Sequence, residues 1–245
     1  MRARTLVASS IVALLLANPA LASPPSAPAA FPATTRYTKA LEESRAKTHV
    51  NVEDLFALAV TAGKEILADI AKADEATATG RAAKPAITAL EGLIISTEEA
   101  LIANPDPNLF GALAEMKGRP ADRAFFKLLV ATRPDGVWAT YFEQQTDVTG
   151  CIRFDLPELS SIYSGWLDFE ARFPSAYRAQ VQDELHGLDN ALLGACACGT
   201  KATVVVGLEA VANALPKEPI AAKIKKRLDE VRNGTSNFQF QCRSG

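Results

Sequence analysis

Apolar residues recur at intervals of three and four along most of the chain, the spacing that places them on one face of an α-helix. The longest stripe comprises Val52, Leu55, Phe56, Ala59, Ala62, Ile66, Leu67 and Ile70. Asn51 stands just before it, where an Asn side chain caps a helix, and Asp54 places a carboxylate in the first turn. The pattern predicts a long helix beginning after Asn51 and, before it, a shorter helix over 35–48.

Breaks rich in proline and glycine separate the later stripes. These stripes predict helices over 85–102, over 108–118, from Pro120, over 137–142, from Pro157, and over 175–199, 200–215 and 219–232. Asn108 is expected to cap the second of these helices. Short links favour antiparallel neighbours. We therefore predict an all-α fold, an irregular antiparallel helical bundle or array of about nine to ten helices.

Little of the sequence alternates in the manner of a half-buried strand. Residues 237–241 alternate weakly, so a short extended piece is expected there, and 146–155 is expected to be a loop. The length suits one helical domain over 34–245. The two places where that domain could divide are 104–107 and 146–156.

The first residues have the features of a secretory signal peptide. Two arginines precede an uncharged apolar run over 6–17, and small residues lead up to Ala22. That run is shorter than the roughly 20 residues that a membrane-spanning helix needs. We predict a signal peptide over 1–22 cleaved after Ala22, a proline-rich flexible leader over 23–33, and a periplasmic or secreted mature chain without a transmembrane segment.

The charge of the chain argues against a nucleic-acid partner. With 26 Lys and Arg against 28 Asp and Glu, the formal net charge is −2. A nucleic-acid-binding protein is expected to carry a concentrated basic face. The expected partner is instead an unidentified protein or a small ligand.

Four cysteines in an exported protein predict disulfides. If the helix over 175–199 is continuous, Cys196 and Cys198 point about 200° apart around its axis and need different partners. A direct bond between these two would require a cramped ring and a helix that has already ended. One of them is therefore expected to pair with Cys151 and the other with Cys242, in either order, so that the C-terminal half is tied by two disulfides.

A Cys-x-Cys pair also occurs in redox-active dithiols and in zinc sites. No thioredoxin-like βαβ pattern accompanies Cys196 and Cys198, which weakens the redox interpretation. The spacing is not that of a zinc ribbon or knuckle, so no metal is expected.

The two candidate sites that do not involve cysteine contain few residues. Asp183 and His186 are three apart on a predicted helix, which could serve a metal or an acid–base pair, although His186 points away from the buried stripe and is expected at the surface. Glu143 and Glu158 lie in a segment rich in aromatic residues, a combination that can bind and cleave sugars. Core spacing explains the same aromatic residues without a ligand.

Nucleophile elbows and phosphate-binding glycine loops are absent from the sequence, so no cofactor is expected. The leading interpretation is a non-catalytic binding or structural protein of the cell envelope or secreted space. One alternative is a cell-wall glycan hydrolase using carboxylates in 138–170. Another is a thiol–disulfide protein using Cys196 and Cys198.

Overall fold

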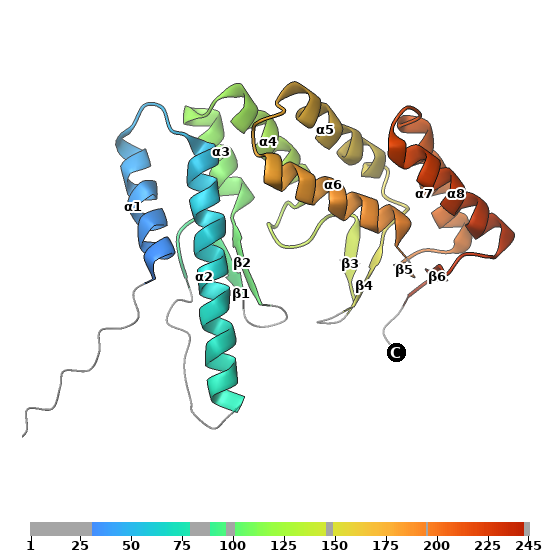
Figure 1. The fold of residues 1–245 in the computed structure, drawn as a ribbon, viewed down its shortest axis with the longest axis horizontal. Coiled ribbons are helices and arrows are strands. Elements are labelled where there is room, and N and C mark those ends of the chain that lie inside the picture. Colours follow the sequence, from blue (N-terminus) through green and yellow to red (C-terminus); the bar gives the residue numbers. More distant parts are fainter. Residues whose placement is uncertain (1–30, 79–88, 97–100, 146–148, 195, 243–245) are drawn as a thin grey trace, which may run out of the picture. The chain divides into compact units, whose positions relative to one another are not determined.

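Helices account for most of the regular structure (Figure 1). The computed structural model describes residues 31–78, 89–96, 101–145, 149–194 and 196–242, so the predicted signal peptide lies outside the described residues. Within these ranges the helices are α1 (Pro32–Ala46), α2 (Val52–Ala78), α3 (Pro107–Lys117), α4 (Pro120–Thr132), α5 (Leu159–Arg172), α6 (Arg178–Leu193), α7 (Lys201–Ala214) and α8 (Pro219–Asn233). The strands are β1 (Leu93–Ser96), β2 (Ile102–Pro105), β3 (Phe142–Gln144), β4 (Gly150–Ile152), β5 (Cys196–Ala197) and β6 (Gln239–Phe240).

The helix-rich fold tied by two disulfides is confirmed, whereas the all-α prediction is only roughly right. The described residues contain eight helices rather than nine to ten, and two small sheets besides. Two of the predicted helices are replaced by strands and turns, which accounts for the lower number. None of the described helices combines the length and apolar character needed to cross a bilayer.

The predicted start of α2 is confirmed. The backbone N–H of Asp54 donates to Oδ1 of Asn51 at 3.3 Å, and the Asn51 amide donates to the Asp54 carboxylate at 2.6 Å. The first of these bonds satisfies a backbone donor that the first turn leaves free, and the second holds the Asn51 side chain in place. The cap predicted for α3 is wrong by two residues, because Asp106 accepts from the backbone N–H of Asn108 at 2.9 Å.

The helix predicted over 85–102 is wrong where the structure describes that stretch. Strands β1 and β2 form an antiparallel pair in which Leu93 faces Pro105 and Ser96 faces Ile102. A short apolar run cannot be assigned to helix or strand by periodicity alone, and the β-branched Ile94 and Ile95 favour a strand.

Strand β2 packs directly on α2, and Gly63 makes this approach feasible. A Cβ atom on Gly63 would lie 2.1 Å from the backbone oxygen of Ala103. Because this oxygen belongs to the backbone, only a movement of the strand away from the helix could relieve the overlap.

We expect Gly63→Ala to lower the free energy of unfolding by about 1–3 kcal/mol, the usual cost of overpacking. Gly111→Ala in α3 is the matched control, since the nearest atom to its added Cβ is 3.7 Å away. That change should be neutral or stabilise by up to about 1 kcal/mol, because alanine favours helix. Urea unfolding of both variants measures the difference, and equal effects would show that α2 and β2 are not in close contact.

An aromatic cluster joins α2, α3, α4 and the start of α6. The ring of Phe56 lies 5.2–6.1 Å from those of Phe110, Phe125, Phe126 and Tyr177, and Phe125 stacks on Tyr177 at 3.8 Å. Such ring pairs add about 0.5–1.5 kcal/mol each beyond the burial of their area.

A buried polar network sets the direction in which α6 begins. Asp122 is fully buried and accepts hydrogen bonds from the backbone N–H of Arg119 at 2.6 Å and from the Tyr177 hydroxyl at 3.0 Å. Tyr177 precedes α6 with a φ of 51°, a strained conformation for a non-glycine residue. Its backbone N–H donates to Glu53 of α2 at 2.6 Å, so α6 is anchored to both α2 and α4.

The helix predicted over 137–142 is also wrong. Trp138 lies in a bend, and Phe142 begins β3. The second sheet has the order β3-β4-β5-β6, with β3 antiparallel to β4 and the other neighbours parallel. The extended piece predicted over 237–241 is confirmed by β6.

Strand β5 corrects the expected extent of the helix that precedes it. Helix α6 ends at Leu193, so Cys196 and Cys198 do not lie on a helix and the 200° argument does not apply. The predicted partner segments are nevertheless correct, because the disulfides are Cys151–Cys198 and Cys196–Cys242. Since β5 lies between β4 and β6, each disulfide ties it to a different neighbour.

Candidate functional site

A cavity of about 410 Å³ opens along the first half of α6, and we call it the α6 cavity. Helices α2, α4 and α6, strand β2, the start of α3 and the segment after α4 supply its walls. It is lined by Phe56, Val60, Lys64, Asn104, Pro105, Pro107, Phe125, Leu129, Arg133, Gly136, Ala179, Gln180, Asp183 and Glu184. Small-molecule sites combine an apolar surface of this kind with a few convergent polar groups.

The floor of the α6 cavity is part of the hydrophobic core. Phe56, Phe125 and Leu129 are buried and belong to one apolar cluster. Their positions follow from the helical stripes of α2 and α4, so the floor is held by packing rather than by a loop. A ligand would therefore meet a surface that is already formed.

One wall holds an ion pair between the half-buried Arg133 and the buried Glu184. Arg133 follows the last residue of α4, and its Nε donates to Oε1 of Glu184 at 2.8 Å. Burial would lower the pKa of Arg133, but the charge of Glu184 and this hydrogen bond outweigh it, so the pKa is raised. Without Arg133 the buried Glu184 carboxylate would lose its charged partner, so the pair is a fixed part of the wall.

Three other polar side chains of the lining are not engaged. Lys64 and Asp183 are exposed and Gln180 is half-buried, and in the part of the chain that the structure describes none of them forms a side-chain hydrogen bond or ion pair. Asn104 donates from its amide nitrogen to the carbonyl of Gly136 at 3.1 Å, which leaves its side-chain oxygen as an acceptor. Apart from the Arg133–Glu184 pair, the cavity thus offers one cation, one carboxylate and neutral polar groups.

A second cavity, of about 370 Å³, follows along the other half of α6 and shares Arg133 with the first. We call it the aromatic cavity because Trp138, Tyr141 and Phe142 line it. The rings of Trp138 and Phe142 lie 5.3 Å apart. Burial, and then the charge of Glu184, raise the pKa of Tyr141 to about 12, so its hydroxyl is neutral at physiological pH.

A larger cavity of about 520 Å³ lies between the start of α5 and α7. Its lining is mostly apolar, with Asp155 as its one charged side chain among the described residues. A site with a single charged group in a mostly apolar lining gives a ligand less specificity than one with several convergent polar groups. The α6 cavity is therefore the stronger candidate.

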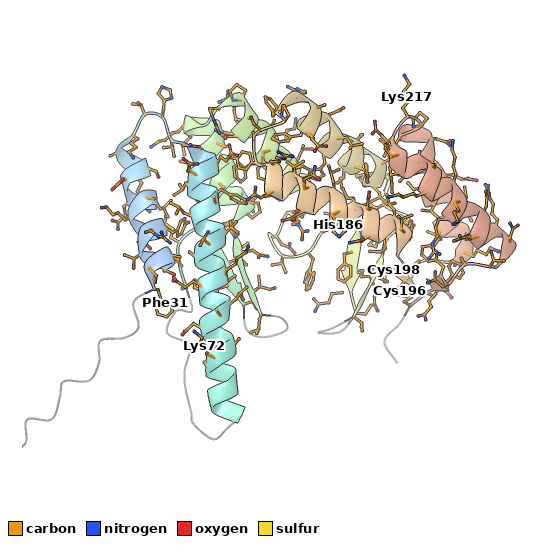
Figure 2. All side chains as sticks on the ribbon, viewed as in Figure 1. Phe31, Lys72, His186, Cys196, Cys198 and Lys217 are labelled. Atoms are coloured by element: carbon orange, nitrogen blue, oxygen red, sulfur yellow. A yellow bond between two sulfur atoms is a disulfide. The ribbon has the colours of Figure 1, made fainter. Side chains whose placement is uncertain are left out.

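The structure separates the candidate residues taken from the sequence. Asp183 lines the α6 cavity. His186 is exposed further along α6 and lines neither the α6 cavity nor the aromatic cavity (Figure 2). Glu143 is exposed on β3, where its carboxylate accepts from the side chain of Gln145 at 2.8 Å. Glu158 is exposed just before α5. Neither glutamate lines a cavity along α6.

The cysteines and the acidic residues form no further centre within the described ranges. Figure 2 places Cys196 and Cys198 beyond the end of α6, and both are disulfide-bonded. Over those same ranges no group of three or more His, Cys, Asp or Glu side chains is arranged to hold a metal ion.

Sequence reasoning missed Lys64, Arg133, Gln180 and Glu184. One signal was present for Glu184, because it falls on the buried stripe of α6 beside Val181, Leu185 and Leu188. A carboxylate on an apolar stripe needs a buried partner. The identity of that partner, Arg133 at the end of α4, depends on the tertiary fold.

Comparisons with protein-family models, with curated proteins and with solved structures find no match, so the site itself carries the functional argument.

Proposed function

We propose that the protein is an exported, non-catalytic binding protein that holds a small molecule in the α6 cavity. The observation that carries the proposal is the composition of that lining. It combines an apolar floor from the core with polar groups that have no partner within the described chain. Unpaired polar groups at the edge of an apolar pocket are what orient a ligand.

The same lining argues against catalysis. It contains no Ser, Thr, Cys or His side chain that could act as nucleophile or histidine base. Of its two carboxylates, Glu184 is bound to Arg133, which leaves Asp183 alone. The glycan-hydrolase alternative has less support, because Glu143 and Glu158 are exposed on separate elements.

Export is supported by two features. The first 22 residues have the sequence pattern of a cleavable signal peptide. The two disulfides are of the kind that persists in oxidising compartments. A periplasmic or secreted location is therefore part of the proposal. The disulfides also give the thiol–disulfide alternative less support, since Cys196 and Cys198 are bonded to separate segments.

A cavity-filling variant tests the binding function. Ala179 is exposed and lines the α6 cavity, so Ala179→Trp should fill it without disturbing the core. Ligand-observed NMR with a library of small amphiphilic fragments should give hits whose binding falls at least tenfold in this variant.

Ala202→Trp is the matched control, because Ala202 is also exposed but lines the cavity between α5 and α7. It should bind the same fragments as the unchanged protein. A library with no hits, or hits lost only in Ala202→Trp, would remove the α6 cavity as the binding site.

A further inference from the structure

We infer that the ligand of the α6 cavity is an α-amino acid with a large apolar side chain, its carboxylate paired with Lys64 and its ammonium with Asp183. The inference rests on the proposed function and adds the chemical class of the ligand. Lys64 projects from α2 and Asp183 from α6, so two different walls supply the two charges.

The two charges share a cavity without forming an ion pair. The ion pairs of the described residues include Arg133 with Glu184 but none that involves Lys64 or Asp183. Both side chains are exposed to solvent. A neutral ligand would displace that water without replacing its hydrogen bonds, which costs free energy. A ligand that carries both charges would compensate both.

The other charges of the lining do not change this balance. Arg133 and Glu184 neutralise each other, so the cavity as a whole carries one free positive and one free negative group. An anion would leave Asp183 without a charged partner, and a cation would leave Lys64 without one. Only a ligand with both signs of charge matches the lining.

The neutral groups fit the same ligand. The side-chain oxygen of Asn104 can accept a second hydrogen bond from an ammonium group, since only its nitrogen is used for Gly136. The amide of Gln180 can donate to a carboxylate. Phe56, Val60 and Leu129 then provide the apolar surface for the side chain of the ligand.

The size of the cavity agrees with one amino acid. Its volume of about 410 Å³ lies near the lower end of the range for small-molecule sites, about 300–1,000 Å³. A phenylalanine or leucine zwitterion fills such a space with room for a few water molecules. The apolar floor disfavours small or polar side chains, which would gain little from burial.

Isothermal titration calorimetry with the disulfide-bonded protein tests the inference. The probes are L-phenylalanine, N-acetyl-L-phenylalanine, which lacks the ammonium, L-phenylalaninamide, which lacks the carboxylate, and n-propylbenzene, which lacks both. We expect phenylalanine to bind at least tenfold more tightly than any of the other three.

Two variants assign each charge to its partner. Lys64→Gln should weaken the binding of phenylalanine at least fivefold. It should leave the binding of phenylalaninamide unchanged, because this probe has no carboxylate to pair with Lys64. Asp183→Asn should weaken the binding of phenylalanine to a similar extent and leave the binding of N-acetylphenylalanine unchanged. Combining each variant with the probe that lacks the matching charge isolates the interaction of Lys64 with the carboxylate and that of Asp183 with the ammonium. The controls Lys72→Gln on α2 (Figure 2) and Asp229→Asn on α8 remove exposed charges outside the cavity and should change nothing.

The outcomes separate this inference from the proposed function. If n-propylbenzene binds as tightly as phenylalanine, or if the losses do not follow the crossed pattern, the inference is overturned while small-molecule binding stands. If fragments bind and Ala179→Trp abolishes their binding but no amino acid binds, the inference is again overturned while small-molecule binding stands. If neither fragments nor amino acids bind, both fail.

Discussion

Raising the pH above about 10 is expected to unfold the protein before its tyrosines ionise in the folded state. The four tyrosines of the chain are all buried, and burial is the largest cause that raises the pKa of each. Three of their hydroxyls donate to fixed acceptors: Tyr37 to the Glu91 carbonyl at 2.8 Å, Tyr163 to Asp189 at 2.5 Å and Tyr177 to Asp122 at 3.0 Å. A phenolate would lose these bonds and, beside the carboxylates, would be repelled.

The direction of the effect follows from proton linkage. Unfolded tyrosine has a pKa near 10, so above that pH the unfolded chain releases protons that the folded chain keeps. The stability contributed by the raised pKa values is complete below pH 10 and is lost as the pH rises. Above pH 10 each tyrosine lowers the free energy of unfolding by up to about 1.4 kcal/mol per pH unit, and the four together lower it by about 5 kcal/mol per pH unit. Typical domains have only about 5–15 kcal/mol to lose.

Tyrosinate absorbance and far-ultraviolet circular dichroism, followed together, measure this effect. The two transitions should coincide in water, above pH 11, whereas in concentrated guanidinium the tyrosines should titrate near pH 10. Tyr141→Phe should reduce the steepness of the pH dependence by about a quarter, since one of four groups is removed. A tyrosine that ionises near pH 10 while the helical signal persists would contradict the expectation.

The second large effect is expected from removing the disulfides. Each closes a loop of similar length, with sequence separations of 47 and 46 residues. Chain entropy assigns about 4 kcal/mol to a loop of this size, as an upper figure. We expect Cys151→Ala with Cys198→Ala to lower the free energy of unfolding by about 3–5 kcal/mol, more than the other pair, because Cys151 is only 1% exposed and its loss leaves a cavity.

The variant pair Cys196→Ala with Cys242→Ala is the matched control, since its loop has nearly the same length but neither cysteine is fully buried. Urea unfolding monitored by tryptophan fluorescence compares the two. Losses below about 1 kcal/mol for both pairs would mean that short strands such as β5 hold together without covalent ties.

Helices with clear caps were predictable from the sequence, and short strands were not. Asn51 and the stripe after it located α2, because both signals are local. Residues 93–96 and 142–144 were misassigned because their strand character depends on partners, and β5 pairs with β6 across more than forty residues. A two-residue strand has no periodicity to detect.

The candidate site was predictable to a smaller extent. Asp183 was singled out for its spacing from His186, yet in the structure it lines the same cavity as Lys64 and Glu184. An exposed lysine on a helix has the same local pattern whether it lines a cavity or faces open solvent. The convergence of α2, α4 and α6 is a property of tertiary packing, so the sequence pattern alone does not disclose it.

The linkage pattern at β5 has a consequence for how the chain matures. In chain order the first cysteine pairs with the third and the second with the fourth. The two closed loops therefore overlap over residues 196–198. An oxidant that joined cysteines in the order in which they emerge would produce Cys151–Cys196 and Cys198–Cys242 instead. That isomer differs from the native one only in exchanging the partners of Cys196 and Cys198, and thiol–disulfide exchange is the route that converts it. The yield of native protein should therefore depend on disulfide isomerisation as well as on oxidation.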